Sequence, residues 1–252
     1  MSPGTVTMLR HGKVDLALHH LRDATVAGGR PLLILHGLGE ASAQNPPTWA
    51  DGWPGPVAAL DFTGHGRSTI PRGGGYTAEL LLGDVDAALN SLTGGDPTRS
   101  VTVVGRGLGA YIALQVAGAR ASQVRGAILV DGPGLAGGPT GPTSQSFFSL
   151  PPSSSTPDPY ALVELGRDLR PPDYATLFVR LALAGSELDE PITVASVFRP
   201  EWLDAVSREH GVIETTLAEA HAAYAGRPRH LRVAFRPCHP PRSPSSSSVG
   251  SS

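Results

Sequence analysis

The chain has 252 residues and a mass of 26.1 kDa, and 40% of its residues are hydrophobic, which suits one soluble globular domain. Its 20 basic and 22 acidic side chains give a net charge of −2, which excludes a generally basic nucleic-acid binder and gives no electrostatic reason for membrane attachment. A single cysteine, Cys238, excludes an internal disulfide and a cysteine-based zinc site. Because there is neither a membrane-spanning apolar run nor a secretion signal, the sequence predicts a cytoplasmic protein.

The first half of the chain predicts strands that alternate with helices. Residues 5–21 alternate apolar and polar side chains around a glycine, which indicates a β-hairpin. Short apolar runs typical of buried parallel strands follow at 32–35, 57–62, 101–104 and 127–130. Helical spacing appears between them, at 77–92 and 107–119. This alternation predicts a doubly wound, mostly parallel sheet.

The second half predicts an insertion, the rest of the sheet and a tail. Residues 133–190 begin as a loop rich in Gly, Pro and Ser and continue as two amphipathic segments. The remaining elements are a strand at 192–198, helices at 201–209 and 212–225, and a last strand at 231–235. Residues 236–252 contain seven serines and four prolines, so we expect a disordered tail after a single domain spanning residues 1–235.

Four strand ends carry a recurrent arrangement of glycines and polar residues. In chain order they are His36-Gly37-Leu38-Gly39, then Asp61 to Ser68 in the pattern D-x-x-G-H-G-x-S, then Gly105 to Gly109, then Asp131-Gly132-Pro133. In this order and spacing the motifs resemble the α/β-hydrolase superfamily over roughly residues 5–225. The resemblance implies a sheet of that family's type, a short helical cap formed by residues 133–190, and hydrolysis by a Ser-His-Asp triad.

The resemblance also implies a role for individual residues. The family's nucleophile elbow, G-x-S-x-G, corresponds to Gly105 to Gly109, and we place Arg106 at the serine's position, where a protonated guanidinium cannot attack an acyl carbon. The oxyanion-hole donors are expected on the backbone N–H groups of Leu38 and Gly107. Asp131 is the candidate acid of the triad, and His239, after the expected last strand, is the nearest match to its histidine.

Structural roles compete with catalytic ones for the same residues. His36 and His65 stand in motifs where histidine mainly packs and hydrogen-bonds loops, and Asp131 is well placed to fix its Gly-Pro turn. We expect Arg106 to lie buried on the cleft side of the sheet. Because a buried guanidinium needs a partner, it should contact Asp131, another acid or an external anion.

Three functions therefore remain open. The first is a catalytically impaired family member that binds a small anionic ligand, a carboxylate or phosphate ester, beside Arg106 at a helix N-terminus. The second is an active hydrolase of small esters or lactones that uses another nucleophile, or water activated by His239 or His65. The third is a non-catalytic interaction scaffold. No cofactor is predicted, since the glycine run lacks the full dinucleotide fingerprint.

Overall fold

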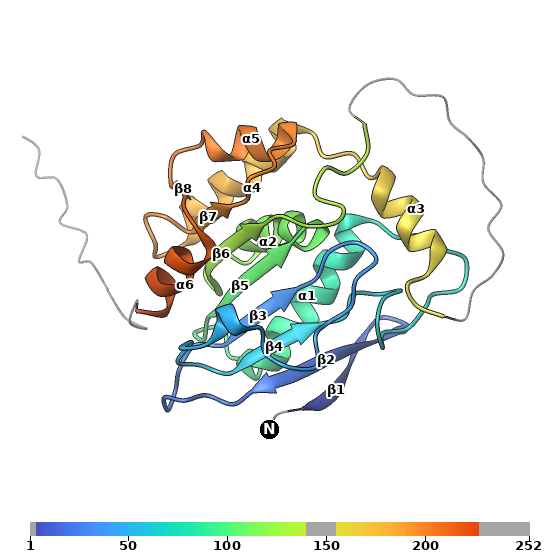
Figure 1. The fold of residues 1–252 in the computed structure, drawn as a ribbon, viewed down its shortest axis with the longest axis horizontal. Coiled ribbons are helices and arrows are strands. Elements are labelled where there is room, and N and C mark those ends of the chain that lie inside the picture. Colours follow the sequence, from blue (N-terminus) through green and yellow to red (C-terminus); the bar gives the residue numbers. More distant parts are fainter. Residues whose placement is uncertain (1–3, 140–154, 227–252) are drawn as a thin grey trace, which may run out of the picture.

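The computed structural model describes residues 4–139 and 155–226, and within them eight strands form one sheet (Figure 1). The strand order is β1-β2-β4-β3-β5-β6-β7-β8. The pairs β1–β2 and β2–β4 are antiparallel and the other pairs are parallel, so the mostly parallel sheet predicted from the sequence is confirmed. The strands are β1 (Thr5–His11), β2 (Val14–Arg22), β3 (Leu32–Leu35), β4 (Val57–Leu60), β5 (Val101–Arg106), β6 (Val124–Val130), β7 (Ile192–Ala195) and β8 (Val212–Glu214).

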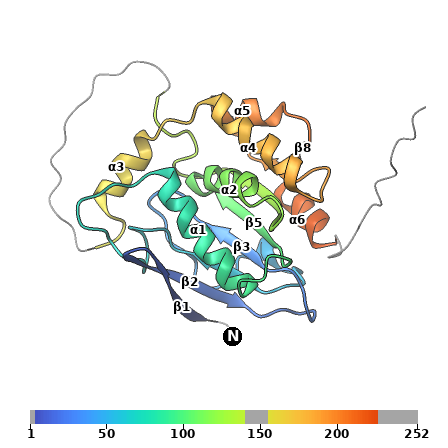
Figure 2. The ribbon, with the colours of Figure 1, turned by 180° about the vertical axis from the view of Figure 1, so that it is seen from behind.

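Helices cover both faces of the sheet (Figure 2). Buried side chains of α1, α2, α4 and α5 form one large core with one face, and those of η1 and α6 form a smaller core with the other. The helices are η1 (Thr48–Ala50), α1 (Ala78–Thr93), α2 (Leu108–Ala119), α3 (Pro159–Arg167), α4 (Pro172–Gly185), α5 (Glu201–Ser207) and α6 (Leu217–Ala225).

The local sequence explains why these elements form. All four residues of β4 are buried, as expected of a central strand covered on both faces. Ten residues of α2 are buried because this small, apolar helix packs between the sheet and α4. The Thr77 hydroxyl accepts a hydrogen bond from the Leu80 N–H at the start of α1, and Gly94 ends that helix in the left-handed conformation at φ 67°.

Two expectations for the C-terminal half were wrong in detail. Residues 212–225 do not form one helix: 212–214 form β8, which pairs with β7, and only 217–225 are helical. The strand expected at 192–198 ends at Ala195, because the next backbone N–H groups hydrogen-bond Asp131 instead of a neighbouring strand. The expected strand at 231–235 and the tail lie outside the described residues. No helix within the described ranges is long and apolar enough to cross a membrane.

Candidate functional site

The turn between β5 and α2 is made by Gly107. Its backbone lies at φ 59° and ψ −119°, which favours glycine. The glycines on either side are needed for packing: a Cβ on Gly105 would lie 2.7 Å from the Cα of Ala110, and one on Gly109 would lie 2.7 Å from the carbonyl oxygen of Leu35. The chain therefore makes a tight strand-to-helix turn of the elbow type, with Gly107 at its apex.

The expectation that Arg106 stands at the serine's position is corrected by this geometry. Arg106 is the last residue of β5, and the third position of the five-residue pattern that begins at Gly105 is Gly107. The position that the G-x-S-x-G pattern gives to serine is thus occupied by a glycine in this chain. Arg106 occupies the variable position before it.

The pattern also places one of its two oxyanion donors one residue later than the expected Gly107. In the elbow pattern they belong to the residue after the nucleophile and to the loop after β3, which here are Leu108 and Leu38. Both N–H groups donate to the carbonyl oxygen of Pro133, at 2.9 Å from Leu108 and 3.0 Å from Leu38. Gly107, the donor expected from the sequence, instead donates to Val130 at 3.0 Å. The two N–H groups at the positions of the pattern's oxyanion donors therefore already donate to the protein's own backbone.

The segment that supplies this carbonyl, residues 132–135, approaches the elbow very closely. A Cβ built on Gly107 would overlap the Pro133 carbonyl oxygen and would lie 2.6 Å from the carbonyl carbon of Gly132. A Cβ on Gly134, which has φ 76°, would lie 2.6 Å from the Cβ of Leu38. Glycines on both sides of Pro133 thus allow an approach that larger residues would prevent. We call residues 132–135 the plug segment.

Two buried side chains hold the plug segment. The Arg170 guanidinium donates to the carbonyl oxygen of Gly134 at 2.5 Å and to that of Leu135 at 2.6 Å, and it lies 4.7 Å from the ring centre of Tyr111. The indole N–H of Trp202 donates to Leu135 at 2.8 Å. Arg170 is 1% exposed, and burial lowers its pKa to about 10. Burying a charged guanidinium costs solvation free energy, which its hydrogen bonds to the plug segment must offset, so we assign Arg170 a structural role.

Arg106 is not buried, contrary to expectation. Its side chain is 49% exposed, and its guanidinium contacts the carboxylate of Glu40 in the loop after β3. The other Glu40 oxygen accepts a hydrogen bond from the Gly37 N–H at 2.9 Å. Burial alone would raise the pKa of Glu40, but the bonds from Arg106 and Gly37 outweigh it and keep that pKa below its usual value. The acid that partners Arg106 is therefore Glu40 and not Asp131.

Asp131 instead organises the loop after β7. Its carboxylate accepts hydrogen bonds from the Ser196 hydroxyl at 2.5 Å, from the Val197 N–H at 2.6 Å and from the Phe198 N–H at 3.0 Å. Burial opposes ionisation of Asp131, but these donors outweigh it and hold its pKa below the ordinary value. These hydrogen bonds fix residues 196–198 and not the Gly-Pro turn expected for Asp131, and its role as the triad acid stays a prediction.

The two motif histidines have structural hydrogen bonds. His36 receives the Phe62 N–H at Nε2 (3.1 Å) and donates from Nδ1 to the carbonyl of Gly37 (2.7 Å). His65 receives the Gly39 N–H at Nε2 (3.2 Å) and donates from Nδ1 to Thr63 (3.1 Å). Burial lowers the pKa of both rings, that of His36 to about 4, so both are neutral at pH 7. Their loop-bonding role is as expected from the sequence.

The loop after β8, where the family resemblance implies a histidine, contains Thr215 and Thr216. Thr216 caps α6: its hydroxyl accepts from the Glu219 N–H, and the Glu219 carboxylate accepts from the Thr216 N–H. The next histidine along the chain, His221, lies in α6 and packs against the ring of Trp53. His239 lies outside the described residues, so its assignment stays a prediction.

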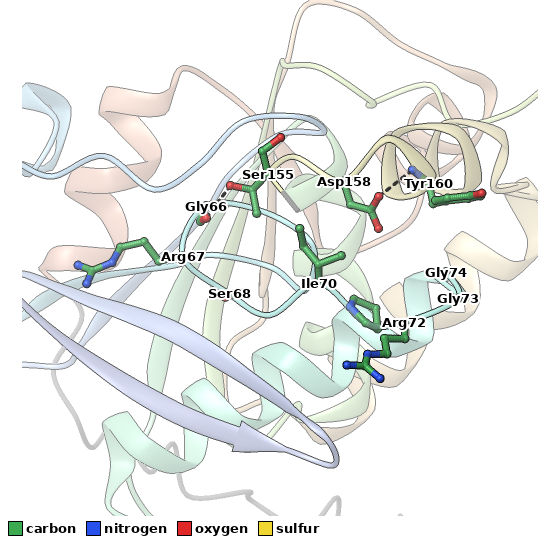
Figure 3. A pocket seen from close by; sticks show the side chains of 12 residues that line it. Gly66, Arg67, Ser68, Ile70, Arg72, Gly73, Gly74, Ser155, Asp158 and Tyr160 are labelled. Atoms are coloured by element: carbon green, nitrogen blue, oxygen red, sulfur yellow. Dashed lines mark hydrogen bonds between the residues drawn. The ribbon is translucent and has the colours of Figure 1, made fainter. Parts of the chain in front are cut away.

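Two hollows border this region. A cavity of about 200 Å³ lies on the η1 and α6 side of the sheet and is lined by Arg106 and Glu40 together with apolar side chains. A wider hollow of about 920 Å³ lies between residues 66–74 and the start of α3 (Figure 3). In the wider hollow the carboxylate of Asp158 is engaged by the Tyr76 hydroxyl at 2.6 Å and by the Tyr160 N–H at 3.2 Å.

Sequence reasoning missed the residues that decide the character of the site. Glu40 lies 66 positions from Arg106, so no local pattern links them. The plug segment did leave a signal, since Gly132-Pro133-Gly134 is a proline between two residues without side chains, which marks a close backbone approach. No cluster of three His, Cys, Asp or Glu side chains within residues 4–139 and 155–226 is arranged to hold a metal ion.

Known proteins share the overall architecture. A family model described as Serine aminopeptidase, S33 matches residues 30–150. The thioesterase domain from the curacin biosynthetic pathway has a TM-score of 0.58 at 16% identity, covering 88% of this chain and 97% of that one. Est1E from Butyrivibrio proteoclasticus, solved with ferulic acid, has a TM-score of 0.57 at 13% identity, covering 87% and 96%. No curated protein sequence matches significantly. At these identities the two structures show a shared fold.

Proposed function

We propose a binding function for this chain, which belongs to the α/β-hydrolase superfamily: it holds a small molecule and does not hydrolyse it through an acyl-enzyme. The observation that carries the proposal is Gly107 at the apex of the elbow. Acyl transfer in this fold begins when a side-chain oxygen at the apex attacks the acyl carbon. Glycine offers no such atom, so the covalent route has no starting point at this position.

The plug segment supports the same proposal. A tetrahedral intermediate needs two free N–H donors for its oxyanion, and those of Leu38 and Leu108 already donate to Pro133. Even water-mediated hydrolysis at the elbow would therefore require residues 132–135 to move. Thr215 and Thr216 in the loop after β8 supply no general base of histidine type, because a threonine hydroxyl does not accept a proton near pH 7 as an imidazole does; Thr216 instead caps α6.

The hydrolytic half of the proposal is tested with a serine-directed fluorophosphonate and short-chain aryl esters. We expect no stoichiometric labelling and ester turnover close to the buffer rate. Loss of a triad nucleophile leaves at most about 10³–10⁴-fold catalysis from the oxyanion hole and binding, and here the oxyanion donors are occupied.

One labelled site per chain, located by peptide mass spectrometry, would contradict the proposal. That result would favour an active hydrolase of small esters or lactones with a different nucleophile. A chain that neither labels nor binds any small molecule, and instead co-purifies with a defined protein, would favour an interaction scaffold.

A further inference from the structure

We propose that the 200 Å³ cavity beside Arg106 binds a monocarboxylate with an apolar tail of about six to eight carbons, its carboxylate on Arg106. This inference rests on the proposed function, because it names the ligand that would be held and not turned over. The cavity lies on the η1 and α6 side of the sheet, away from the large core that α2 shares with the other helices. A ligand can thus enter it while the plug segment stays in place.

The walls of the cavity are mostly apolar, with His36 and Ser42 as the polar side chains besides the ion pair. Ile34, Val104 and Val130 line it from neighbouring strands β3, β5 and β6, and Trp49 and Leu217 line it from η1 and α6. Such a surface favours a hydrocarbon tail, since every CH₂ moved from water into it gains free energy.

One end of the cavity is charged. Side chains alternate along a strand, so Arg106 shares the face of Val104 and continues the cavity wall to the end of β5. Arg106 and Glu40 are 49% and 33% exposed, which puts them where the cavity meets solvent. Only one guanidinium nitrogen of Arg106 has a hydrogen-bond partner among the described residues, the Glu40 carboxylate. The remaining N–H groups of the fork are available to a second carboxylate.

The cavity volume sets the length of the tail. An apolar cavity of about 150 Å³ holds one benzene molecule, so 200 Å³ accommodates roughly eight carbon atoms. The carboxylate itself lies outside this volume, at the solvent end. We therefore expect affinity to increase with chain length and to stop increasing once the cavity is full.

The experiment measures binding of acetate, butanoate, hexanoate, octanoate and dodecanoate to the full chain by titration calorimetry, with intrinsic tryptophan fluorescence, to which Trp49 in the cavity wall contributes, as a second readout. Affinity should rise about fourfold for each added CH₂ up to octanoate, and dodecanoate should bind no more tightly than octanoate. Octanol should bind at least about tenfold more weakly than octanoate, because it cannot form the charge-assisted bonds to Arg106.

Substitutions in the ion pair give opposite effects under this proposal. Arg106→Gln should weaken octanoate binding by more than about tenfold. Glu40→Gln should strengthen it by about threefold or more, because it removes a competing negative charge while its amide oxygen still accepts from Gly37. A purely structural ion pair would give weaker binding in both variants. Arg180→Gln and Glu209→Gln disrupt a comparable exposed pair elsewhere and should leave binding unchanged.

Leu217→Trp fills the cavity from its edge and should abolish binding without touching the charges, so it carries the test if an ion-pair variant fails to fold. Equal affinity for octanoate and octanol, or no effect of Arg106→Gln, would overturn the inference. Absence of binding across the acid series would also overturn it. That failure is distinct from failure of the proposed function, which is decided by fluorophosphonate labelling.

Discussion

At the scale of single residues, the site depends on which residue stands at the apex of one turn. Gly107 stands at the third position of the elbow pattern, and its lack of a side chain leaves the space that the Pro133 carbonyl fills. Arg106, one position earlier, projects to the other face of the sheet and contacts Glu40. Adjacent residues of a strand point to opposite faces, so a shift of one position moves a side chain from one core to the other.

Replacing Gly107 with serine should destabilise the fold strongly and restore no activity. The serine would adopt a positive φ and would also overlap the Pro133 carbonyl, so we expect a loss of at least about 3 kcal/mol in unfolding free energy. Gly12→Ser is the matched control: Gly12 has φ 58° and no atom within 4 Å of the position that a Cβ would occupy, so only about 1 kcal/mol should be lost. Denaturant titration measures both. Equal losses would show that the plug segment moves aside without cost.

His36 should make stability depend on pH. Burial lowers its pKa from 6.5 to about 4 in the folded chain, so between these values the unfolded chain binds more protons. The free energy of unfolding should therefore fall as pH drops from 6.5 to 4, by about 3 kcal/mol from this group. His36→Gln keeps an acceptor for the Phe62 N–H and should remove that part of the slope. A variant with the wild-type slope would refute the assignment.

The sequence predicted residue roles well where they depend on neighbours in the chain. His36 and His65 donate to backbone carbonyls of the loops that contain them. The sequence predicted residue roles poorly where the partner is distant, as for Arg106 with Glu40 and for Asp131 with the loop after β7. The assignment of Arg106 to the serine's position failed for a simpler reason, since the pattern places its third residue at Gly107.

At the scale of elements, the plug segment 132–135 is the feature that closes the elbow. Arg170 lies two residues before α4 and Trp202 lies in α5, so segments far from the elbow in the sequence hold the carbonyls of the plug segment. The closed state is therefore maintained by contacts well outside the elbow.

Arg170→Met should loosen the plug segment. It leaves the Gly134 carbonyl without the hydrogen bond that Arg170 donates, while the side chain remains apolar and of similar length. The Leu38 and Leu108 amides, which donate to Pro133, should then exchange with solvent at least about tenfold faster in hydrogen-exchange measurements. The Gly107 amide donates to Val130 in β6 and is the internal control. Equal acceleration of all three amides would indicate general destabilisation instead.

Among elements, the long apolar patterns were predictable and the short ones were not. The hairpin, the four central strands and helices α1 and α2 each extend over enough residues for period 2 or 3.6 to be visible. β8 has only three residues, and its pattern merges with the helical spacing of α6. Whether three residues form a strand is decided by pairing with β7, which is a tertiary contact.

At the scale of the whole molecule, the two faces of the sheet have separate roles. The face of α1, α2, α4 and α5 contains the larger core, and the face of η1 and α6 contains the smaller core and the cavity. Tyr224 ties α6 to the sheet, because its hydroxyl lies 3.0 Å from the Thr193 hydroxyl and donates to the carbonyl of Glu190. The cavity face therefore depends on α6.

Shortening the chain at two positions should separate the fold from the tail. A chain that ends at Arg236 should keep its melting temperature within error, because residues 237–252 offer few apolar groups that could pack. A chain that ends at Glu214 lacks α6 with its buried Ala220 and Tyr224, and should melt many degrees lower. Differential scanning calorimetry compares the two. A large loss in the longer chain would mean that the tail packs on the fold, and would favour a site role for His239.

The Pro133 carbonyl also has a consequence for how the sequence can evolve. A mutation that placed serine at position 107 would put its side chain in a space that the backbone already fills, so it would lower stability before it could add reactivity. The plug segment would have to retract first, and that change by itself brings no activity while glycine remains at 107. A serine at position 107 would therefore be tolerated only after the plug segment has changed, and that first change brings no gain in activity on which selection for hydrolysis could act.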